Sequence, residues 1–373
     1  MEANNPIRLS RCALGDKAFD FVKEALDSSY LGMGRYVDVF ENKLSEIFSR
    51  EVITVSSGTT ALHLAIEALE LKPNDEIIAP SITYLSTFQA IAAAGANPVA
   101  CDIDLNGQIS IKSLKEKINK KTKAIIPVHY AGNSFEIEEL YSLAKENNLR
   151  VIEDAAHAFG SKYKGKYIGS FGDIACFSFD GIKNITCGEG GCIVTDDLKL
   201  KDKIKSKRSL GVENDHLKRF KNKRTWEPKV SIKGWRAHMS NINAAIGLSQ
   251  IEIMHENFKK RTELSKYYIH KLKKLSEHLK VVEISEEHIP HIFPIFLFEN
   301  NRDELRNFLS DFKIETGIHY YPCHLLEFFK TENILPNSNL FYERTLSLPL
   351  HPELDFSQID FIISKLNSFF IKK

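Results

Sequence analysis

The sequence predicts an α/β fold in which helices cover both faces of a mostly parallel sheet. Between residues 50 and 200, short apolar runs of strand length alternate with segments whose apolar residues recur at helical spacing. This alternation is typical of βαβ units, whose crossover helices bury parallel strands from both sides. The chain of 373 residues is long enough for one large domain and a smaller one.

The expected elements of the large domain follow one another closely along the chain. A first strand ends at residues 53–55, and further strands are expected at 77–79, 98–103, 124–128, 150–153, 174–179 and 191–195. Helices are expected between them at 60–71, 87–94, 111–119 and 135–147. In open α/β sheets, ligands bind at the carboxyl ends of the strands, so functional residues are expected where the apolar runs stop.

The second half of the chain predicts a smaller C-terminal α+β domain. After a polar stretch at 199–235 that reads as irregular, a long helix is expected over 241–274. Four later segments read as strand, strand, helix and helix, at residues 281–283, 291–298, 302–312 and 358–369. We therefore expect a large domain at residues 1–250, including the N-terminal segment, and a small domain at 251–373.

Charge and cysteine usage indicate a cytoplasmic protein with no nucleic-acid or membrane partner. The formal net charge is +1, and the most basic stretch, residues 199–224, contains acidic residues and reads as a solvated surface helix and loop. Six scattered cysteines form no Cys-x-x-Cys pair, as expected in a reducing compartment. The N-terminal MEANNPIRLS has no apolar core of a secretion signal, and no apolar run is long enough for a membrane span.

The segment VSSGTTALHLAIEAL joins a strand end to an amphipathic helix through a turn of small residues that includes Gly58 and Thr59. Free backbone N–H groups and the positive end of the helix dipole make such a turn a natural phosphate site. A plain helix cap, with glycine serving only turn geometry, is the alternative.

Asp154 ends an apolar strand in LRVIEDAAHAFG, and His157 follows three residues later. A buried carboxylate requires a cationic or hydrogen-bonding partner, and a protonated pyridine nitrogen is one such partner. A structural helix cap is the alternative. A zinc site is disfavoured because no second histidine or cysteine lies nearby at ligand spacing, so no metal is expected.

Lys183 lies between two apolar strands in FSFDGIKNITCGEGG, although most lysines are surface residues. A desolvated lysine has a lowered pKa and can act as a Schiff-base nucleophile. The phosphate site, Asp154 and Lys183 are together the three attachments that pyridoxal 5′-phosphate needs.

The chain resembles the DegT/DnrJ/EryC1/StrS family of sugar aminotransferases, which are pyridoxal-phosphate enzymes of fold type I. The resemblance runs from LGMGRYVDVFENKLSEIF through EDAAHAFGSKYKGKYIGSFGDIACFSF to SLPLHPEL. It implies that Lys183 forms the internal aldimine and moves protons, Asp154 pairs with the pyridinium nitrogen, and His157 lies by the phenolic oxygen of the ring. The other cofactor contacts that it implies are ring stacking by Tyr84 and phosphate binding by Gly58, Thr59 and Ser178.

The same resemblance implies a homodimer whose active sites are shared between two chains. Relatives often carry an asparagine, reaching the phosphate of the neighbouring subunit, where GWRAHM has Arg236. Arg236 is expected to replace it as a charged donor, with a role limited to the interface as the alternative. In GIHYYPCHLL, His319 and Tyr320 match the segment that approaches the sugar nucleotide, whereas a simply packed loop is the alternative.

The activity implied by the resemblance is transfer of the amino group of L-glutamate to C4 of a nucleotide-linked 4-keto-6-deoxyhexose, dTDP- or GDP-linked, with ping-pong kinetics. Amination at C3 is the first alternative. A pyridoxal-phosphate sugar dehydratase is disfavoured because such branches usually have histidine at the position of Lys183. A non-catalytic sensor is disfavoured because the whole pocket is retained. The product is expected to enter a cell-surface polysaccharide such as the O-antigen of lipopolysaccharide, with an antibiotic sugar as the alternative.

Overall fold

The structure is a computed structural model that describes residues 5–212, 227–283 and 285–371. A sheet of seven strands forms its centre, in the order β1-β9-β8-β5-β4-β2-β3. The strands are β1 (Glu51–Val55), β2 (Glu76–Pro80), β3 (Asn97–Cys101), β4 (Thr122–Ile125), β5 (Arg150–Asp154), β8 (Ile174–Ser178) and β9 (Gly191–Thr195). Neighbours from β8 through β5, β4 and β2 to β3 pair in parallel, which confirms the predicted sheet.

Only β9 runs against the rest of this sheet, pairing antiparallel with both β8 and β1. A parallel connection requires a crossover of a dozen or more residues, usually with a helix. The connection from β8 to β9 contains no helix, so the chain returns directly beside β8. That returning loop carries Lys183 over the carboxyl end of the sheet.

Helices cover both faces of the sheet, and each face has its own apolar core. One face packs against α3 (Gly58–Ala68), α4 (Ser86–Ala93) and α7 (Leu198–Arg208). The other face packs against α2 (Arg35–Phe48), α5 (Ile111–Lys117), α6 (Ile137–Glu146) and the first half of α9 (Asn241–Leu272). The side chains of each strand alternate between these two cores, as the pleat requires.

Residues 199–235 were expected to be irregular, but their first part forms helix α7, and some side chains of this helix are buried. Although the helix is basic, Arg208 at its end is fully buried. Its Nη1 atom donates to the Glu41 carboxylate and to the backbone oxygen of Thr54, and these contacts offset part of the cost of burying the charge. The rest of the basic stretch, residues 213–226, lies outside the described residues.

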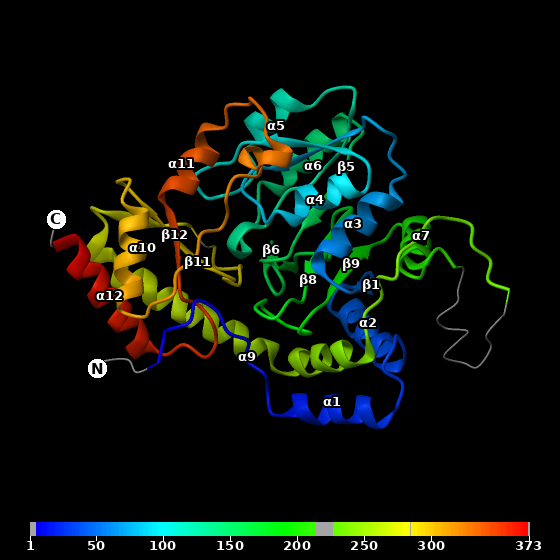
Figure 1. Cartoon of the computed structure of the whole chain (residues 1–373), viewed down its shortest axis with the longest axis horizontal. Helices are drawn as coiled ribbons and strands as arrows, with labels where there is room; N and C mark the ends of the chain where they lie inside the picture. The colour runs from blue at the N-terminus through cyan, green and yellow to red at the C-terminus, as the bar shows by residue number, and fades with distance from the viewer. Residues whose placement is uncertain (1–4, 213–226, 284, 372–373) are drawn as a thin grey trace.

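A second, smaller sheet lies at the other end of α9. It consists of β10 (Leu279–Val281), β11 (Phe293–Leu297) and β12 (Thr345–Leu348), all antiparallel. Helices α10 (Arg302–Asp311) and α11 (Pro336–Arg344) lie between β11 and β12 in the chain, and α12 (Phe356–Ile371) follows β12. Helix α1 (Lys17–Asp27) packs along α9. Figure 1 shows α9 running beneath the large sheet towards α10 and α12.

Helix α9 belongs to both parts of the molecule. Met254 and Phe258 join the core of the large sheet, whereas Leu264 and Tyr268 join that of the small one. The division predicted at residue 250 falls within this helix and stays a prediction. The N-terminal segment also reaches the small core, because Ile7 is buried there and bridges to Ile314. Over the described residues, no helix combines the length and apolar character needed to cross a membrane.

Candidate active site

The start of helix α3 forms one wall of a cavity at the carboxyl end of the sheet. Ser57 caps the helix by accepting a hydrogen bond from the backbone N–H of Thr60 (3.1 Å). Gly58 follows, and a Cβ atom there would lie 2.7 Å from the Cβ of Ser178, so glycine permits this close approach. Gly58, Thr59 and Ser178 all line the cavity, where the N-terminus of the helix favours an anion.

Asp154 lies at the end of β5 and lines the same cavity, although its side chain is buried. Its carboxylate accepts hydrogen bonds from the Thr87 hydroxyl (2.9 Å) and the Ala156 backbone N–H (3.2 Å). Burial raises the pKa of this carboxyl, although its two hydrogen bonds and the charge of Lys183 oppose the shift. No ion pair to Asp154 forms in the described part of the chain. The carboxylate is therefore held in place without a cation against it.

Lys183 enters the cavity from the loop between β8 and β9, where its backbone N–H binds the backbone oxygen of Asp180 (3.0 Å). Its amine makes no ion pair with the described residues. Burial lowers the pKa of Lys183 from 10.5 to about 8, although Asp154 and Asp180 oppose this shift. The neutral, nucleophilic form of the amine is therefore far more abundant near neutral pH than it is for an ordinary lysine.

Two rings from distant parts of the chain meet above Asp154. The Nε2 atom of His157 lies 2.9 Å from the Tyr320 hydroxyl, and the Nδ1 atom of His157 is buried with no partner among the described residues. Burial, together with Lys183 and His319, lowers the pKa of His157 well below its usual value, so the imidazole is neutral. His319 is anchored separately, through its Nδ1 atom, to the Ser347 hydroxyl (2.8 Å).

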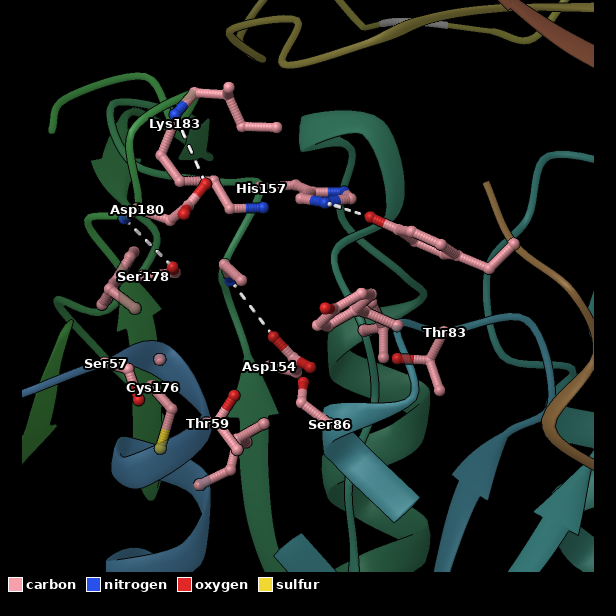
Figure 2. Close-up of a pocket in the computed structure, with 18 of the residues that line it drawn as sticks. Ser57, Thr59, Thr83, Ser86, Asp154, His157, Cys176, Ser178, Asp180 and Lys183 are labelled. Atoms are coloured by element: carbon pink, nitrogen blue, oxygen red, sulfur yellow. Dashed lines mark hydrogen bonds between the residues drawn. The ribbon is translucent and has the colours of Figure 1, made fainter. Parts of the chain in front are cut away.

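The cavity has a volume of about 420 Å³ and brings together nine of the ten residues predicted for the site. Figure 2 shows several of them converging on it, with Asp154 below His157 and Lys183. The nine are Gly58, Thr59, Tyr84, Asp154, His157, Ser178, Lys183, His319 and Tyr320. The tenth, Arg236, is exposed, pairs with Ser209 through a backbone bridge and does not line the cavity.

The structure also adds residues to the site that the sequence did not point out. Thr87 binds Asp154, Asp180 lies against Lys183, and His291 packs on His157 with ring centroids 4.4 Å apart. Thr87 and Asp180 lie close in sequence to predicted residues, which is the one signal that could have revealed them. His291 lies just before a strand, and nothing in its local sequence separates it from a core residue.

These residues fit pyridoxal phosphate. The helix N-terminus suits the phosphate, and a buried carboxylate without a cation suits a protonated ring nitrogen. The unpartnered Nδ1 atom of His157 leaves one polar atom for a ligand. More than half of the Tyr84 side chain is exposed, so its ring is accessible for stacking.

Comparison with known proteins gives a consistent result. The family model for DegT/DnrJ/EryC1/StrS aminotransferases matches residues 13–367. GDP-perosamine synthase of Escherichia coli O157:H7 is 37% identical over 369 residues, covering 97% of this chain and 98% of that protein.

Solved structures agree with this assignment. PseC of Helicobacter pylori, an aminotransferase involved in the biosynthesis of pseudoaminic acid, superposes with a TM-score of 0.93 at 28% identity and covers 99% of this chain and 100% of its own. The PLP form of the putative sugar aminotransferase Spr1654 from Streptococcus pneumoniae gives a TM-score of 0.89 at 26% identity, covering 96% and 97%. The chain thus belongs to the DegT/DnrJ/EryC1/StrS aminotransferase family and is a pyridoxal-phosphate-dependent sugar aminotransferase.

Proposed function

We propose that this aminotransferase moves the amino group of L-glutamate to C4 of a nucleotide-linked 4-keto-6-deoxyhexose. The observation that carries the proposal is the position of the Lys183 amine, with a pKa of about 8, in one cavity with Asp154 and the start of α3. His319 and Tyr320 line the same cavity and are the side chains we assign to the sugar side of the site. Because both substrates use one cavity in turn, ping-pong kinetics are expected.

The cofactor supplies the aldehyde and the electron-accepting ring. Asp154 keeps a positive charge at the buried end of the cavity, where Thr87 and the Ala156 N–H fix its orientation. The N–H groups at the start of α3 and the hydroxyls of Thr59 and Ser178 hold the anionic end. Tyr84, which lines the cavity, would stack on the cofactor ring.

Lys183 moves the proton. In the first half-reaction its Nζ atom takes a proton from the α-carbon of the amino donor, and in the second half-reaction it gives a proton to the aminated carbon of the acceptor. A lowered pKa suits this role, because a base near the operating pH both accepts and releases a proton readily. Asp180, beside Lys183, keeps the amine from becoming too weak a base.

The nucleotide and the position of amination are supported by resemblance. The relative named GDP-perosamine synthase matches along almost its whole length, which supports a GDP-linked substrate over a dTDP-linked one. The GWRAHMSNINAAIG and GIHYYPCHLL segments resemble members that aminate C4. The product would then enter a cell-surface polysaccharide such as an O-antigen.

A homodimer with shared sites belongs to this proposal. Both substrates are anionic, yet Lys183 is the only lysine or arginine among the described residues that line the cavity. Asp180 and Glu189 line it as well, so further positive charge must come from outside. Arg236, exposed on the surface, is our candidate donor to the neighbouring subunit. The six free thiols fit the cytoplasmic location that we infer.

To test the proposal, purified enzyme is incubated with L-glutamate and one acceptor at a time. The acceptors are the 4-keto-6-deoxyhexose and its 3-keto isomer, each linked to GDP or to dTDP. Formation of 2-oxoglutarate is measured together with the mass and NMR spectrum of the amino sugar. Amination of the 4-keto sugar is expected. Amination of the 3-keto isomer alone would contradict the proposal and favour the C3 alternative.

A further inference from the structure

Tyr320, matched by resemblance to the sugar side of the site, makes its one described side-chain hydrogen bond to His157, across 2.9 Å. The two residues come from distant segments, the loop after β5 and the segment between α10 and α11. The dashed line from His157 in Figure 2 marks this bond. The contact indicates that Tyr320 acts on another side chain of the site.

The direction of this hydrogen bond follows from the polar atoms around it. The Tyr320 hydroxyl has no other acceptor among the described residues, and burial raises the pKa of Tyr320, so the phenol keeps its proton. If Nε2 of His157 donated instead, the phenolic hydrogen would be left without an acceptor in a partly buried site. Donation from Tyr320 to Nε2 satisfies that hydrogen.

The tautomer of His157 follows in turn. A neutral imidazole carries one N–H, and the environment keeps His157 neutral. When Nε2 accepts from Tyr320, the ring proton must reside on Nδ1. That Nδ1 atom is buried and has no partner in the described part of the chain, so its N–H remains available to a ligand oxygen.

His291 restrains the His157 ring from a second side. The two rings lie 4.4 Å apart at an angle of 38°. Asn184 donates its amide hydrogen to the backbone oxygen of Phe159 (3.1 Å), so its Oδ1 atom is the acceptor facing Nδ1 of His291 (3.3 Å). His291 is therefore also fixed in orientation, and burial lowers its pKa well below the usual value. An uncharged, anchored ring thus supports His157.

We propose that Tyr320 is a positioning residue: it donates its phenolic hydrogen to Nε2 of His157 and holds His157 as the Nδ1–H tautomer, ready to donate to an oxygen of the bound cofactor. This inference rests on the proposed place of His157 beside the phenolic oxygen of pyridoxal phosphate. It gives Tyr320 a role in the cofactor site in addition to its proposed place on the sugar side.

The first test reads the tautomer directly. Cofactor-free protein with ¹⁵N-labelled histidine is measured by long-range ¹H–¹⁵N NMR, and the signals of His157 are assigned, among thirteen histidines, by their loss in His157→Gln. The wild type is expected to show the Nδ1–H form alone, and Tyr320→Phe is expected to show a mixture. An Nε2–H form in the wild type, or an unchanged spectrum in Tyr320→Phe, would overturn the proposal.

The second test is a double-mutant cycle in the half-reaction with L-glutamate, followed by the absorbance of the bound cofactor. Tyr320→Phe is expected to slow this step roughly fivefold, the effect of about one hydrogen bond, without changing the dissociation constant for glutamate. In a His157→Gln background, Tyr320→Phe should slow the half-reaction by less than about twofold, because the glutamine amide has an N–H donor that does not depend on a tautomer. Equal losses in both backgrounds would contradict the tautomer mechanism.

Tyr321→Phe is the matched control. It removes the same hydroxyl one residue further along, from a ring that packs on Tyr342 and does not line the cavity. Neither the histidine spectrum nor the half-reaction should change. Failure of the proposed transfer to a 4-keto sugar would leave these readouts intact, because the first needs no cofactor and the second uses the amino donor alone.

Discussion

Two neighbouring carboxylates on β5 point to opposite faces of the sheet and differ in their partners. Glu153 is completely buried, and its oxygens lie 2.7 Å from Nε2 of His129 and 2.6 Å from the hydroxyl of Tyr141. Asp154 is also buried but accepts only from the neutral Thr87 hydroxyl and a backbone N–H. Glu153 thus faces an imidazole, whereas Asp154 is hydrogen-bonded but has no cationic partner, and in this sense its charge is unpartnered.

The cations show the same difference. Arg50 is buried and fully used, because its guanidinium donates to the Asp196 carboxylate and to backbone oxygens of residues 169–173. Lys183, in the cavity, makes no ion pair with any described residue. Since an uncompensated buried charge is costly, it marks a place where a ligand completes the site, whereas the compensated charges hold the fold.

Removing the unpartnered cation should have the largest effect on activity. Lys183→Ala is expected to lower the rate of 2-oxoglutarate release from L-glutamate by roughly 10³-fold or more, because it removes the proton-transfer group. Thermal unfolding of the cofactor-free protein should be nearly unchanged, since no ion pair is broken. Lys123→Ala, at an exposed lysine outside the cavity, is the control. Similar losses of activity in Lys183→Ala and Lys123→Ala would contradict the distinction between buried charges that await a ligand and charges that hold the fold.

Neutralising the unpartnered carboxylate is the next test. Asp154→Asn keeps the shape of the side chain but cannot stabilise a protonated nitrogen of the cofactor ring. The rate of 2-oxoglutarate release is therefore expected to fall roughly 10²-fold. Burial raises the pKa of Asp154, so the charged form destabilises the empty fold at neutral pH, and stability is regained as the pH falls through the raised pKa. Chemical denaturation should therefore show Asp154→Asn to be at least as stable as the wild type without cofactor.

Glu153→Gln should reverse this pattern. His129 and Tyr141 contact different oxygens of Glu153, and glutamine has an oxygen at only one of these two positions, so one contact must face the NH₂ group and the free energy of unfolding should fall by roughly 2 kcal/mol. Activity of the folded enzyme should change little. Glu139→Gln on the surface is the control, with a change within about 0.5 kcal/mol. Urea unfolding measures both, and a stable but inactive Glu153→Gln would contradict the comparison.

The smallest expected effect is a shift in the pH at which the Lys183 amine becomes reactive. Because burial lowers the pKa of Lys183 to about 8, its amine should become reactive as the pH rises through 8, where an ordinary lysine does so near 10.5. Acetylation of the cofactor-free protein by trace acetic anhydride, quantified for the peptide containing Lys183, measures this midpoint. In Asp154→Asn the midpoint should fall further, because the carboxylate that raises the pKa is lost. A midpoint near 10.5 would show that the amine is not desolvated.

Much of the fold and of the site follows from local sequence. Alternating apolar runs predicted the strands of the large sheet, because each strand is buried on both faces. Gly58, Asp154 and Lys183 were predicted because each follows a strand, and a parallel sheet brings such ends together. The direction of β9 was not predicted, although the lack of a helix between β8 and β9 is a local signal for it.

Contacts between distant segments could not be predicted in this way. His291 and Tyr320 reach His157 from segments more than a hundred residues away, and only the folded chain brings them there. Arg208 lies in a basic helix that reads as solvated, because its partners Glu41 and Thr54 are remote in sequence. Hydrophobic periodicity reports which face of an element is buried but not which side chain it meets.

The backbone bridge between Ile7 and Ile314 has a consequence for synthesis of the chain. Ile7 leaves the ribosome about 300 residues before Ile314, with which it pairs. Until Ile314 is made, the apolar side chain of Ile7 has no place in the small core, and closure must then join segments about 300 residues apart in sequence, a slow kind of contact. An expression fragment that begins within α9 would lack this N-terminal residue from the outset, and supplying the missing segment as a peptide is a direct route to restoring that core.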